Sequence, residues 1–560
     1  MMVEVEDPTA QSRRLPWAAQ YPRAVDWLLD IPVRPVHALL DDAVAAFAAR
    51  PFLDFLGSRQ TYAQVAWLIA KAALGFQRLG TRKGTKVGLL LPNSPYSVIC
   101  YFAILKAGGT VVNYDPLCAE QELIRQIEDS ETDIMVTLDL TILHGKVAAA
   151  LPKTGLRHVV ICKMAEVLPF FRGLMFRVAR WREIAKPSRR NGQMFFDELI
   201  DNDGAYEAVE IAPLSDVAVI QYTGGTTGEP KGVMLSHQNI YANTCQIRAW
   251  FTRAEPGQER VLAILPFSHS FGMTAVMNFA ASLGGELVIF PRFDLKQTLR
   301  AIERKHVTIL VGVPTLFRAI NQCPEIRRYD LSSLKICISG GDSLPRAVLR
   351  KFVELTECPL AEGYGLTECA PVVTCGNPLE GVDRSGSCGL PLPRTTVEIV
   401  SLQSPRGVLP KGERGEICVS GPQVMLGYWR QAEATRNCLI DGHLHTGDLG
   451  WMDADGFLYF VDRAKDVISV HGYKVYPRNV EDSIRLHPDV IDVAVIGVPD
   501  PIRGQAPKAY VVLAKGTQLS EDGLRAFLTD KLSPFKIPRL FEFRNDLPKS
   551  TAGKVLKRAI

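Results

Sequence analysis

The chain has 560 residues, of which 47% are hydrophobic and 22% are charged, and its formal net charge is +4. This balance is typical of soluble globular proteins and excludes a disordered, collagen-like or fibrous chain. A charge of +4 over this length is also no signature of a general nucleic-acid binder. At about 150 residues per domain, the length predicts two to four domains.

The sequence gives no sign of a membrane span, a secretory signal or a zinc site. The longest apolar candidate, residues 98–105, stops at Lys106, well short of the roughly 18 residues that a spanning helix needs. The start, MMVEVEDPTA, is acidic, unlike a signal peptide. The twelve cysteines form no CxxC pair, and His443 and His445 lack further ligands in sequence. We expect a cytoplasmic protein with reduced, mostly buried cysteines.

Short apolar runs alternate with helical periods through the first two thirds of the chain. The runs predict buried strands at residues 86–91, 110–114, 216–222, 261–265, 286–290, 306–313 and 334–340. The periods between them predict helices at residues 94–108, 295–305 and 344–355. Continuous apolar strands separated by helices are typical of α/β domains with a doubly wound, mostly parallel sheet. Such sheets bind ligands at the carboxyl ends of their strands.

The pattern of apolar and glycine residues changes after about Val397. Short strands punctuated by glycine, at residues 396–401, 415–421 and 456–463, predict a small β-barrel-like subdomain at about 390–464. A compact unit of strands and helices follows. We therefore predict a large N-terminal domain over residues 1–464 and a small, mobile α+β domain over residues 465–560.

The string YTGGTTGEPKGV begins at Tyr222, at the end of an expected strand. Consecutive Gly and Thr let backbone N–H groups and hydroxyls approach a polyphosphate, and Lys231 adds a positive charge. The string is not a Walker loop, because Lys231 follows Pro230 rather than Gly and no Ser or Thr comes after it. A flexible hairpin is the alternative, but the whole string after a buried strand favours a phosphate loop.

This string resembles the AMP-binding signature of the adenylate-forming superfamily, which includes acyl-CoA synthetases, luciferases and the adenylation domains of peptide synthetases. The resemblance extends in order through nearly the whole chain and is greatest to bacterial long- and medium-chain fatty-acid–CoA ligases. It implies that the residues of this string bind ATP and AMP: Thr223, Gly224, Gly225, Thr226, Thr227, Gly228 and Lys231. Of these, Thr223 and Lys231 would also be catalytic.

Two further strings resemble the family segments that contact the acyl group and the ribose. LPFSHSFGM resembles the family segment whose His lies beside the acyl carboxylate, which implies that role for His269. Met273 and Gly312 fall in the apolar segments 267–277 and 312–317, which are expected to line the acyl pocket. HTGDLG resembles the family's ribose-binding segment and implies that Asp448 accepts hydrogen bonds from the ribose hydroxyls. Arg463 resembles the arginine that contacts ribose or phosphate.

Two more strings resemble the family segments that contact the adenine and the magnesium ion. SGGDSLP is a turn between a strand and a helix, and the resemblance implies that Gly341 and Asp342 border the adenine. EGYGLTEC resembles the family's YGxTE motif. There Tyr364 would stack on the adenine, Thr367 would bind near the α-phosphate, and Glu368 would act in catalysis by holding Mg²⁺. One carboxylate suffices, because Mg²⁺ is usually bound by few protein ligands together with substrate phosphates.

The last strings resemble the family's hinge and its mobile catalytic tail. DRAKDVISVHGYKVYPRNVED implies that Lys465 is the hinge and that Gly472 faces the coenzyme A channel. LPKSTAGKVLKR implies that Lys554 is catalytic and bridges the acyl carboxylate and the α-phosphate, where charge builds up. One domain swing would withdraw Lys554 and bring in Gly472.

The resemblance implies an ATP-dependent acyl-CoA ligase that uses Mg²⁺ as cofactor and ATP and coenzyme A as co-substrates. The expected pocket segments are apolar and hold no cation, which favours a fatty or aryl acid over an amino or dicarboxylic acid. An aryl-acid CoA ligase and a fatty acyl-AMP ligase that loads a carrier protein stay open. A non-catalytic acyl or nucleotide sensor is the different-class alternative, against which the intact Lys554 and Glu368 argue.

Residues 163–190 differ from these motifs. They hold eight Lys or Arg and two Glu among bulky apolar residues. Basic and bulky apolar residues in one short helix suit a membrane interface, so the protein could lie peripherally on the inner face of the membrane. The alternative is an internal amphipathic helix with a solvated basic edge. The sequence also leaves open whether the chain forms a homodimer.

Overall fold

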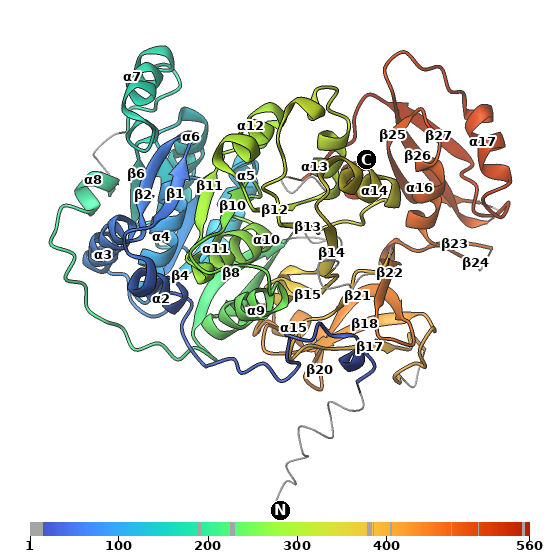
Figure 1. Ribbon diagram of the computed structural model, residues 1–560, viewed down its shortest axis with the longest axis horizontal. Helices are drawn as coiled ribbons and strands as arrows, with labels where there is room; N and C mark the ends of the chain where they lie inside the picture. The colour runs from blue at the N-terminus through green and yellow to red at the C-terminus, as the bar shows by residue number, and fades with distance from the viewer. Residues whose placement is uncertain are drawn as a thin grey trace, which may run out of the picture.

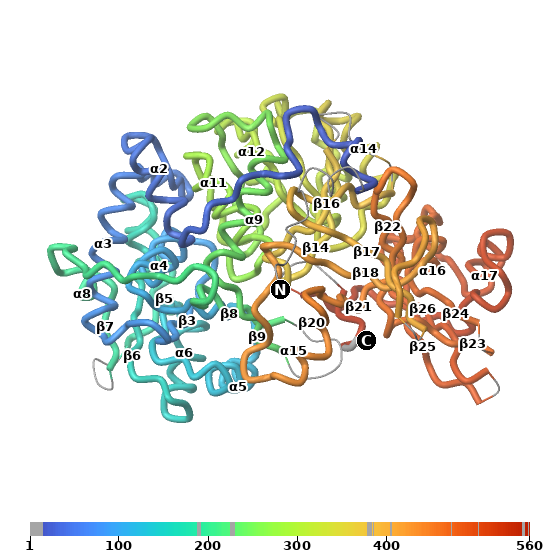
Figure 2. Tube along the Cα trace, turned by 90° about the horizontal axis from the view of Figure 1, so that it is seen from below, coloured from blue at the N-terminus to red at the C-terminus, as the bar shows by residue number. Residues whose placement is uncertain are grey.

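The computed structural model describes residues 15–187, 192–223, 230–377, 384, 386–403, 406–471, 473–501, 503–550 and 555–560. Within these ranges, two large sheets with helices packed around them form the body of the molecule, and two smaller sheets follow towards the C-terminus (Figures 1 and 2). None of the described helices is long and apolar enough to cross a membrane.

The first large sheet holds nine described strands and is parallel through its centre. Its strand order is β16 (Leu390–Pro391), β15 (Val372–Cys375), β14 (Leu360–Gly365), β13 (Ile336–Ser339), β12 (Ile309–Gly312), β10 (Arg260–Ala263), β11 (Glu286–Ile289), β1 (Pro51–Phe55) and β2 (Ser58–Thr61). The strands β14 and β12 end in the predicted site residues, so this sheet presents them at its carboxyl edge.

The second large sheet holds eight described strands, and its parallel centre is extended by the antiparallel β8–β9 hairpin. Its strand order is β19 (Gly427–Tyr428), β9 (Lys231–Ser236), β8 (Val217–Thr223), β4 (Thr110–Asn113), β3 (Lys86–Leu90), β5 (Ile134–Leu138), β6 (His158–Cys162) and β7 (Gln193–Phe195). The predicted α/β class with mostly parallel sheets is therefore confirmed.

The helices of the large domain connect the strands and cover the sheets (Figure 1). The helix α4 is buried from Pro95 to Leu105, because its sequence is apolar on every side, and a capping box of Ser94 and Ser97 begins it. The helices with at least seven residues are α2 (Ala38–Phe47), α3 (Tyr62–Arg78), α4 (Pro95–Lys106), α5 (Glu120–Ser130), α6 (Thr141–Ala150), α7 (Phe170–Ala179), α9 (His237–Trp250), α12 (Leu295–Lys305), α13 (Pro314–Asn321), α14 (Arg346–Thr356) and α15 (Ala432–Cys438).

Shorter helical turns lie between these elements. They are η1 (Ala18–Gln20), η2 (Leu151–Lys153), η3 (Met164–Glu166), α8 (Phe196–Leu199), α10 (Ser270–Gly272), the π-helical η4 (Met273–Asn278), α11 (Phe279–Leu283), η5 (Ile326–Arg328) and η6 (Thr367–Cys369). π-Helical turns occur frequently at functional sites. The turn η4 overlaps the end of the predicted acyl-binding segment.

The third sheet is antiparallel and forms most of the predicted β-rich subdomain. It consists of β17 (Thr396–Val400), β18 (Gly415–Ser420), β21 (His443–Met452), β20 (Leu439–Ile440) and β22 (Leu458–Arg463). The described strands pair as an open sheet rather than the expected barrel-like closure. In addition, β16 and β19 belong to the two large sheets, because segments inside 390–464 return to pair with them.

The C-terminal domain has its own sheet and its own apolar core, separate from the core between the large sheets. Its elements are η8 (Ala464–Asp466), β23 (Ile468–Val470), β24 (Tyr473–Val475), α16 (Pro477–Arg485), β25 (Val490–Asp500), β26 (Gly504–Leu513), α17 (Glu521–Thr529), β27 (Leu540–Arg544) and η9 (Lys557–Ala559). Ten of the twelve cysteines are buried, as expected for free cysteines.

Candidate active site

The predicted phosphate loop is carried by the hairpin of β8 and β9. Thr223, the last residue of β8, is paired in register with Lys231, the first residue of β9. Their backbones lie together, with the Thr223 hydroxyl 3.5 Å from the Lys231 carbonyl oxygen. The other predicted loop residues, Gly224, Gly225, Thr226, Thr227 and Gly228, lie outside the described residues. The hairpin therefore fixes both ends of the loop at the sheet's edge.

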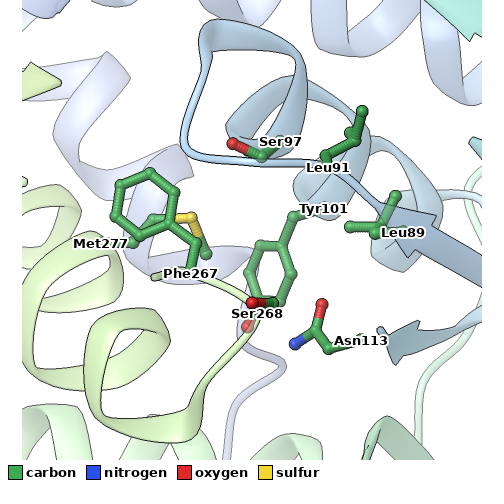
Figure 3. Close-up of a pocket in the computed structure, with 8 residues that line it drawn as sticks. All are labelled: Leu89, Leu91, Ser97, Tyr101, Asn113, Phe267, Ser268 and Met277. Carbon is green, nitrogen blue, oxygen red and sulfur yellow. The ribbon is translucent and has the colours of Figure 1, made fainter. Parts of the chain in front are cut away.

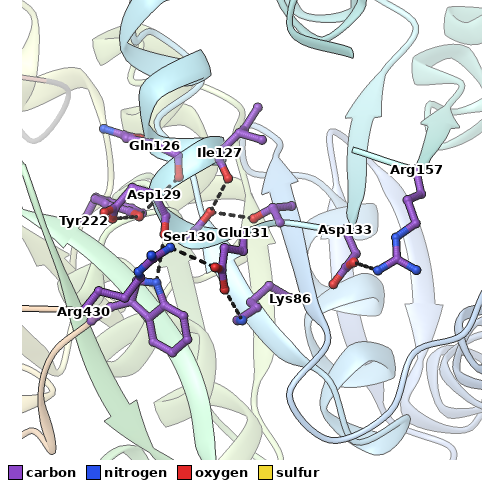
Figure 4. Close-up of polar contacts among 12 residues, drawn as sticks. Lys86, Gln126, Ile127, Asp129, Ser130, Glu131, Asp133, Arg157, Tyr222 and Arg430 are labelled. Atoms are coloured by element: carbon purple, nitrogen blue, oxygen red, sulfur yellow. Dashed lines mark hydrogen bonds and ion pairs between the residues drawn. The ribbon is translucent and has the colours of Figure 1, made fainter. Parts of the chain in front are cut away.

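The base of this hairpin is tied to the end of α5 (Figure 4). The hydroxyl of Tyr222 donates to the carboxylate of Asp129, and burial raises the pKa of that tyrosine. The indole of Trp429, just after β19, donates to the Asp129 carbonyl oxygen at 2.9 Å. Arg430 forms an ion pair with Glu131 at 2.8 Å. One helix end thus holds both β8 and the chain after β19.

Lys231, Tyr428 and Glu368 form a chain of contacts beside the hairpin. The ammonium of Lys231 lies 4.7 Å from the centre of the Tyr428 ring. The Tyr428 hydroxyl donates to one Glu368 carboxylate oxygen at 2.9 Å. Burial raises the pKa of Glu368, so its charged form is costly without a compensating cation. A carboxylate with hard oxygen ligands and one lone pair already oriented fits a Mg²⁺ ion.

Tyr364, Asp448 and Arg463 meet where β14 approaches the antiparallel sheet. The Tyr364 hydroxyl donates to one Asp448 oxygen at 2.9 Å, and Arg463 Nε lies 3.5 Å from the other oxygen. Asp448 and Arg463 are register partners of β21 and β22, which explains how residues 15 positions apart meet. The Tyr364 ring also lies 6.0 Å from the ring of Phe460. Three residues predicted to bind one nucleoside thus lie together.

A buried carboxylate behind this cluster shapes the turn that carries Asp448. Glu416 on β18 accepts the Gly447 N–H at 3.0 Å through one oxygen. Its other oxygen lies 2.9 Å from His445 Nδ1. The Asp448 N–H donates to the Thr446 hydroxyl, so the whole turn is held by side chains. Sequence motifs did not single out Glu416, because its role depends on strand pairing.

The same turn gives His445 the neighbours that the sequence did not show. Cys418 Sγ lies 3.4 Å from His445 Nδ1, and the ligand atoms of Glu416, Cys418 and His445 lie within 4.8 Å of one another. The guanidinium of Arg406 lies 3.5 Å from the same nitrogen, and its positive charge opposes a cation there. His443 contacts Glu398 instead. The cluster is explained by its hydrogen bonds to the turn.

The predicted acyl and phosphate motifs meet between α10 and η6. The Ser270 hydroxyl lies 3.2 Å from the Thr367 hydroxyl, and His269 precedes Ser270 as the half-buried N-cap of α10. Met273 follows one turn later and is fully buried. Its sulfur lies 3.5 Å from Asn113 Nδ2. The segment that follows β10 thus lies beside the YGLTE segment.

The predicted adenine turn follows β13 and lies beside β12. Gly312 is paired in register with Ser339, and its carbonyl accepts the Gly340 N–H at 3.1 Å. Gly341 has φ +81°, a conformation that L side chains rarely adopt. Asp342 is exposed, and its carboxylate accepts the Ser343 N–H. The turn therefore presents exposed backbone at the carboxyl edge of the sheet.

A pocket lies beside the segment that contains Phe267, Ser268 and Met277, against α4 and the carboxyl ends of β3 and β4 (Figure 3). It is lined by Leu89, Leu91, Ser97, Tyr101, Asn113, Phe267, Ser268 and Met277. The predicted segment 267–277 supplies three of these residues. The others come from β3 and the residue that follows it, from α4 and from β4, and sequence reasoning missed them because no motif marks them. Their place near the carboxyl ends of β3 and β4 was the available signal.

The ends of the tail that carries Lys554 lie on the C-terminal domain. Lys549 and Val555 form an antiparallel bridge, and Lys549 forms an ion pair with Asp492 on β25 at 2.8 Å. The carbonyl of the adjacent Ile491 accepts a hydrogen bond from Arg318 of α13, in the large domain. Lys465 is exposed in η8. Gly472 and Lys554 themselves lie outside the described residues.

Comparison with known proteins identifies the family. The AMP-binding enzyme model matches residues 40–429, and the model of the AMP-binding enzyme C-terminal domain matches residues 479–554.

The chain belongs to the AMP-binding enzymes.

Among curated members of this family, the long-chain-fatty-acid–CoA ligase of Bacillus subtilis is 40% identical over 548 residues, 97% of each chain. That of Escherichia coli is 38% identical over 530 residues, 93% of each chain. The crystal structure of ATP-bound MatB from Rhodopseudomonas palustris matches with a TM-score of 0.81 at 27% identity, covering 94% of this chain and 98% of that one. The expected adenylate-forming fold is confirmed.

Proposed function

We propose that this AMP-binding enzyme is a long-chain-fatty-acid–CoA ligase. It activates the acid with ATP to acyl-AMP and pyrophosphate, then transfers the acyl group to the thiol of coenzyme A and releases AMP. The names of relatives that match over nearly the whole chain support this proposal. The observation that carries it is the pairing of Tyr364, Asp448 and Arg463 beside the Lys231–Tyr428–Glu368 chain.

In the first step, an acid oxygen attacks the α-phosphorus of ATP and pyrophosphate leaves. Thr223, the loop residues 224–228 and Lys231 surround the phosphates whose charge grows, while Lys554 bridges the acid and the α-phosphate. Asp448 and Arg463 hold the ribose, Tyr364 stacks on the adenine, and the turn of Gly341 and Asp342 borders it. Preorganised donors of this kind each contribute on the order of 3 kcal/mol to the transition state.

Glu368 is the residue that fits a magnesium ion. Its carboxylate is half-buried and costly to ionise, and only one of its oxygens is engaged by Tyr428 in the described contacts. When bound, the ion supplies positive charge that neutralises the triphosphate. Thr367 is held beside Ser270, and its hydroxyl would orient the α-phosphate.

The second step requires a different arrangement of the two domains, which we place at residues 1–464 and 465–560. Lys465 lies in the short turn η8, between β22 of the third sheet and β23 of the C-terminal sheet. Backbone rotation there would move the C-terminal domain as one body. The swing withdraws Lys554 and brings Gly472 to the channel for the pantetheine arm. The lack of a side chain at Gly472 leaves room for the thiol.

We place the acyl chain along the pocket shown in Figure 3, which has a volume of about 10 Å³ and would have to widen to admit it. The pocket lining is mostly apolar, and part of it comes from the segment that also carries His269 and Met273. Each buried methylene contributes about 0.8 kcal/mol, so the pocket gains affinity with chain length. Such an enzyme works in the cytoplasm, and its acids reach it from the inner face of the membrane.

A panel of acids tests the proposal. Pyrophosphate release and acyl-CoA formation are measured with saturated acids from hexanoate to octadecanoate, and with benzoate, ferulate and malonate, each with and without coenzyme A. We expect kcat/KM to rise about fourfold per added methylene until the pocket is full. A preference for the aryl acids, or acyl-AMP formation without transfer to coenzyme A, would contradict the proposed substrate or acceptor.

A further inference from the structure

The helix α7 is the most unusual part of the molecular surface. It projects from the body beyond the edge of the second large sheet (Figure 1). Phe170 and Phe171 are 79% and 78% exposed, and Met175 and Val178 are each 69% exposed. Leu174 and Trp181 are also more than half exposed. Single exposed apolar side chains are ordinary, but six large ones within twelve residues form a patch that marks an interaction surface.

The opposite face of α7 attaches the helix to the body. Gly173 packs so closely against η3 that a Cβ would lie 2.5 Å from the Ala165 carbonyl oxygen. Phe176 packs against the apolar core, and Arg172 donates to the Leu56 carbonyl oxygen at 2.7 Å. The exposed residues recur at helical spacing on the other side. The outward apolar face is therefore held in place rather than left free to fold inward.

Basic side chains gather at one end of this face. Arg177, Arg180 and Arg182 lie at its C-terminal end, and the guanidinium of Arg182 stacks 5.2 Å from the Trp181 ring. Arg177 and Arg180 also contact Glu166 and Glu183. The described segment 163–187 carries six Lys or Arg against two Glu. An apolar face with phenylalanines and a tryptophan, edged by arginines, has the composition of an interfacial helix.

We propose that α7 docks the protein on an anionic membrane surface, with the face of Phe170, Phe171, Leu174, Met175, Val178 and Trp181 inserted among the lipids. The arginines then meet lipid phosphates, while Trp181 lies at the headgroup level. A second copy of the chain fits less well, because a twofold contact through this face would bring the same arginines together. The inference does not depend on which acid the enzyme uses.

Tryptophan quenching by brominated lipids tests the insertion directly. Trp181 and Trp67 are each 57% exposed and each lies under a cationic side chain, but Trp67 is on α3. In anionic vesicles of brominated phosphatidylglycerol and phosphatidylcholine, Trp181→Phe should remove most of the quenching, whereas Trp67→Phe should keep it. Equal quenching in both variants would overturn the proposal.

Co-sedimentation measures the contribution of the patch to binding. We expect the wild type to bind phosphatidylglycerol vesicles at least fivefold better than phosphatidylcholine vesicles, and this preference should weaken with salt. Phe171→Ser with Met175→Ser should reduce binding at least tenfold. The matched control, Leu214→Ser with Leu486→Ser, changes two exposed residues elsewhere and should bind as the wild type does. No binding at low salt would refute the proposal.

Charge reversal and oligomeric state separate the remaining occupants. Arg177→Glu with Arg180→Glu and Arg182→Glu should abolish the preference for anionic vesicles. Without lipid, the wild type should sediment as the same species as the Phe171→Ser, Met175→Ser variant. A wild-type dimer that the variant does not form would assign the face to a second copy of the chain. Unchanged melting temperature and unchanged turnover of a short, water-soluble acid show that the variants are folded, so loss of docking is distinct from loss of catalysis.

Discussion

At the scale of single residues, the carboxylates of the candidate site are each held by a different partner. Glu368 is held by Tyr428 and Asp448 by Tyr364 and Arg463, while Glu416 lies behind Asp448 and holds its turn. A phenol hydroxyl orients a carboxylate oxygen without neutralising it, so Glu368 keeps its demand for a cation. The arginine beside Asp448 lowers the cost of its charge.

The Glu368 carboxylate should make activity depend jointly on pH and magnesium. Burial raises the pKa of Glu368, so a falling pH protonates it earlier than an ordinary glutamate and removes a ligand of the ion. We expect the acid limb of kcat/KM to shift to lower pH as Mg²⁺ is raised, because the ion competes with the proton. In Glu368→Gln, pyrophosphate exchange should fall about 10²–10³-fold and the shift should vanish. An acid limb that ignores Mg²⁺ would contradict this assignment.

Glu416 should act as a positioning residue for Asp448. Glu416→Ala removes the acceptor of the Gly447 N–H, a hydrogen bond to a charged group worth about 1.5–3 kcal/mol. We expect KM for ATP to rise about tenfold with little change in kcat, and Glu416→Gln to restore most of the affinity. The control is Glu398→Ala, which removes the carboxylate beside His443 on the neighbouring strand and should leave KM unchanged. Equal effects of both alanine variants would show a general loss of stability.

At the scale of elements, the strands and helices were predictable where one period dominates. The helix over residues 295–305 was predicted to the residue, because Asp294 caps it and its apolar positions repeat at helical spacing. The contribution of β3, α4 and β4 to the pocket was not predictable. It depends on which strands become neighbours, and Leu91 and Asn113 carry no local mark of that.

The contact between β8 and α5 should control the phosphate loop. Tyr222→Phe removes a hydrogen bond to a charged acceptor, worth about 1.5–3 kcal/mol, at the residue that precedes Thr223. We expect both a lower melting temperature and a KM for ATP raised several-fold. Tyr114→Phe is the matched control. This change also removes a buried hydroxyl that is hydrogen-bonded at the end of α5, to Ser130 and Thr132, but Tyr114 follows β4 rather than lying on β8. Its melting temperature should fall while KM stays the same.

At the scale of the whole molecule, sequence motifs assigned roles to residues far apart, and the fold brings several of them together. Tyr364 and Asp448 are 84 positions apart and share a hydrogen bond. The relation between the two domains was harder to foresee, because no motif or periodicity marks the residues through which they touch. The Arg478 N–H donates to the Asp462 carboxylate at 2.9 Å, and Arg318 reaches the Ile491 carbonyl. Individual polar contacts of this kind can be exchanged in a swing.

The swing predicts that the two half-reactions can be lost separately. Lys554→Ala removes the cation needed while the acid attacks ATP, so acyl-AMP formation should fall about 10²–10³-fold. Thioester formation from supplied acyl-AMP should stay within about twofold, because Lys554 has by then been withdrawn. Gly472→Leu should do the reverse, since its side chain would obstruct the thiol but not the nucleotide.

The measurements are pyrophosphate exchange for the first step and acyl-CoA formation from synthetic acyl-AMP for the second. Lys557→Ala is the control in the same tail. Its ammonium forms an ion pair with Glu481 within the C-terminal domain at 2.7 Å, so its loss should lower stability without separating the two steps. Gly407→Leu controls for a larger side chain, because a Cβ there meets nothing within 4 Å. If Lys554→Ala slowed both steps equally, one rigid arrangement would have to serve both reactions, and Lys465 would lose its role as hinge.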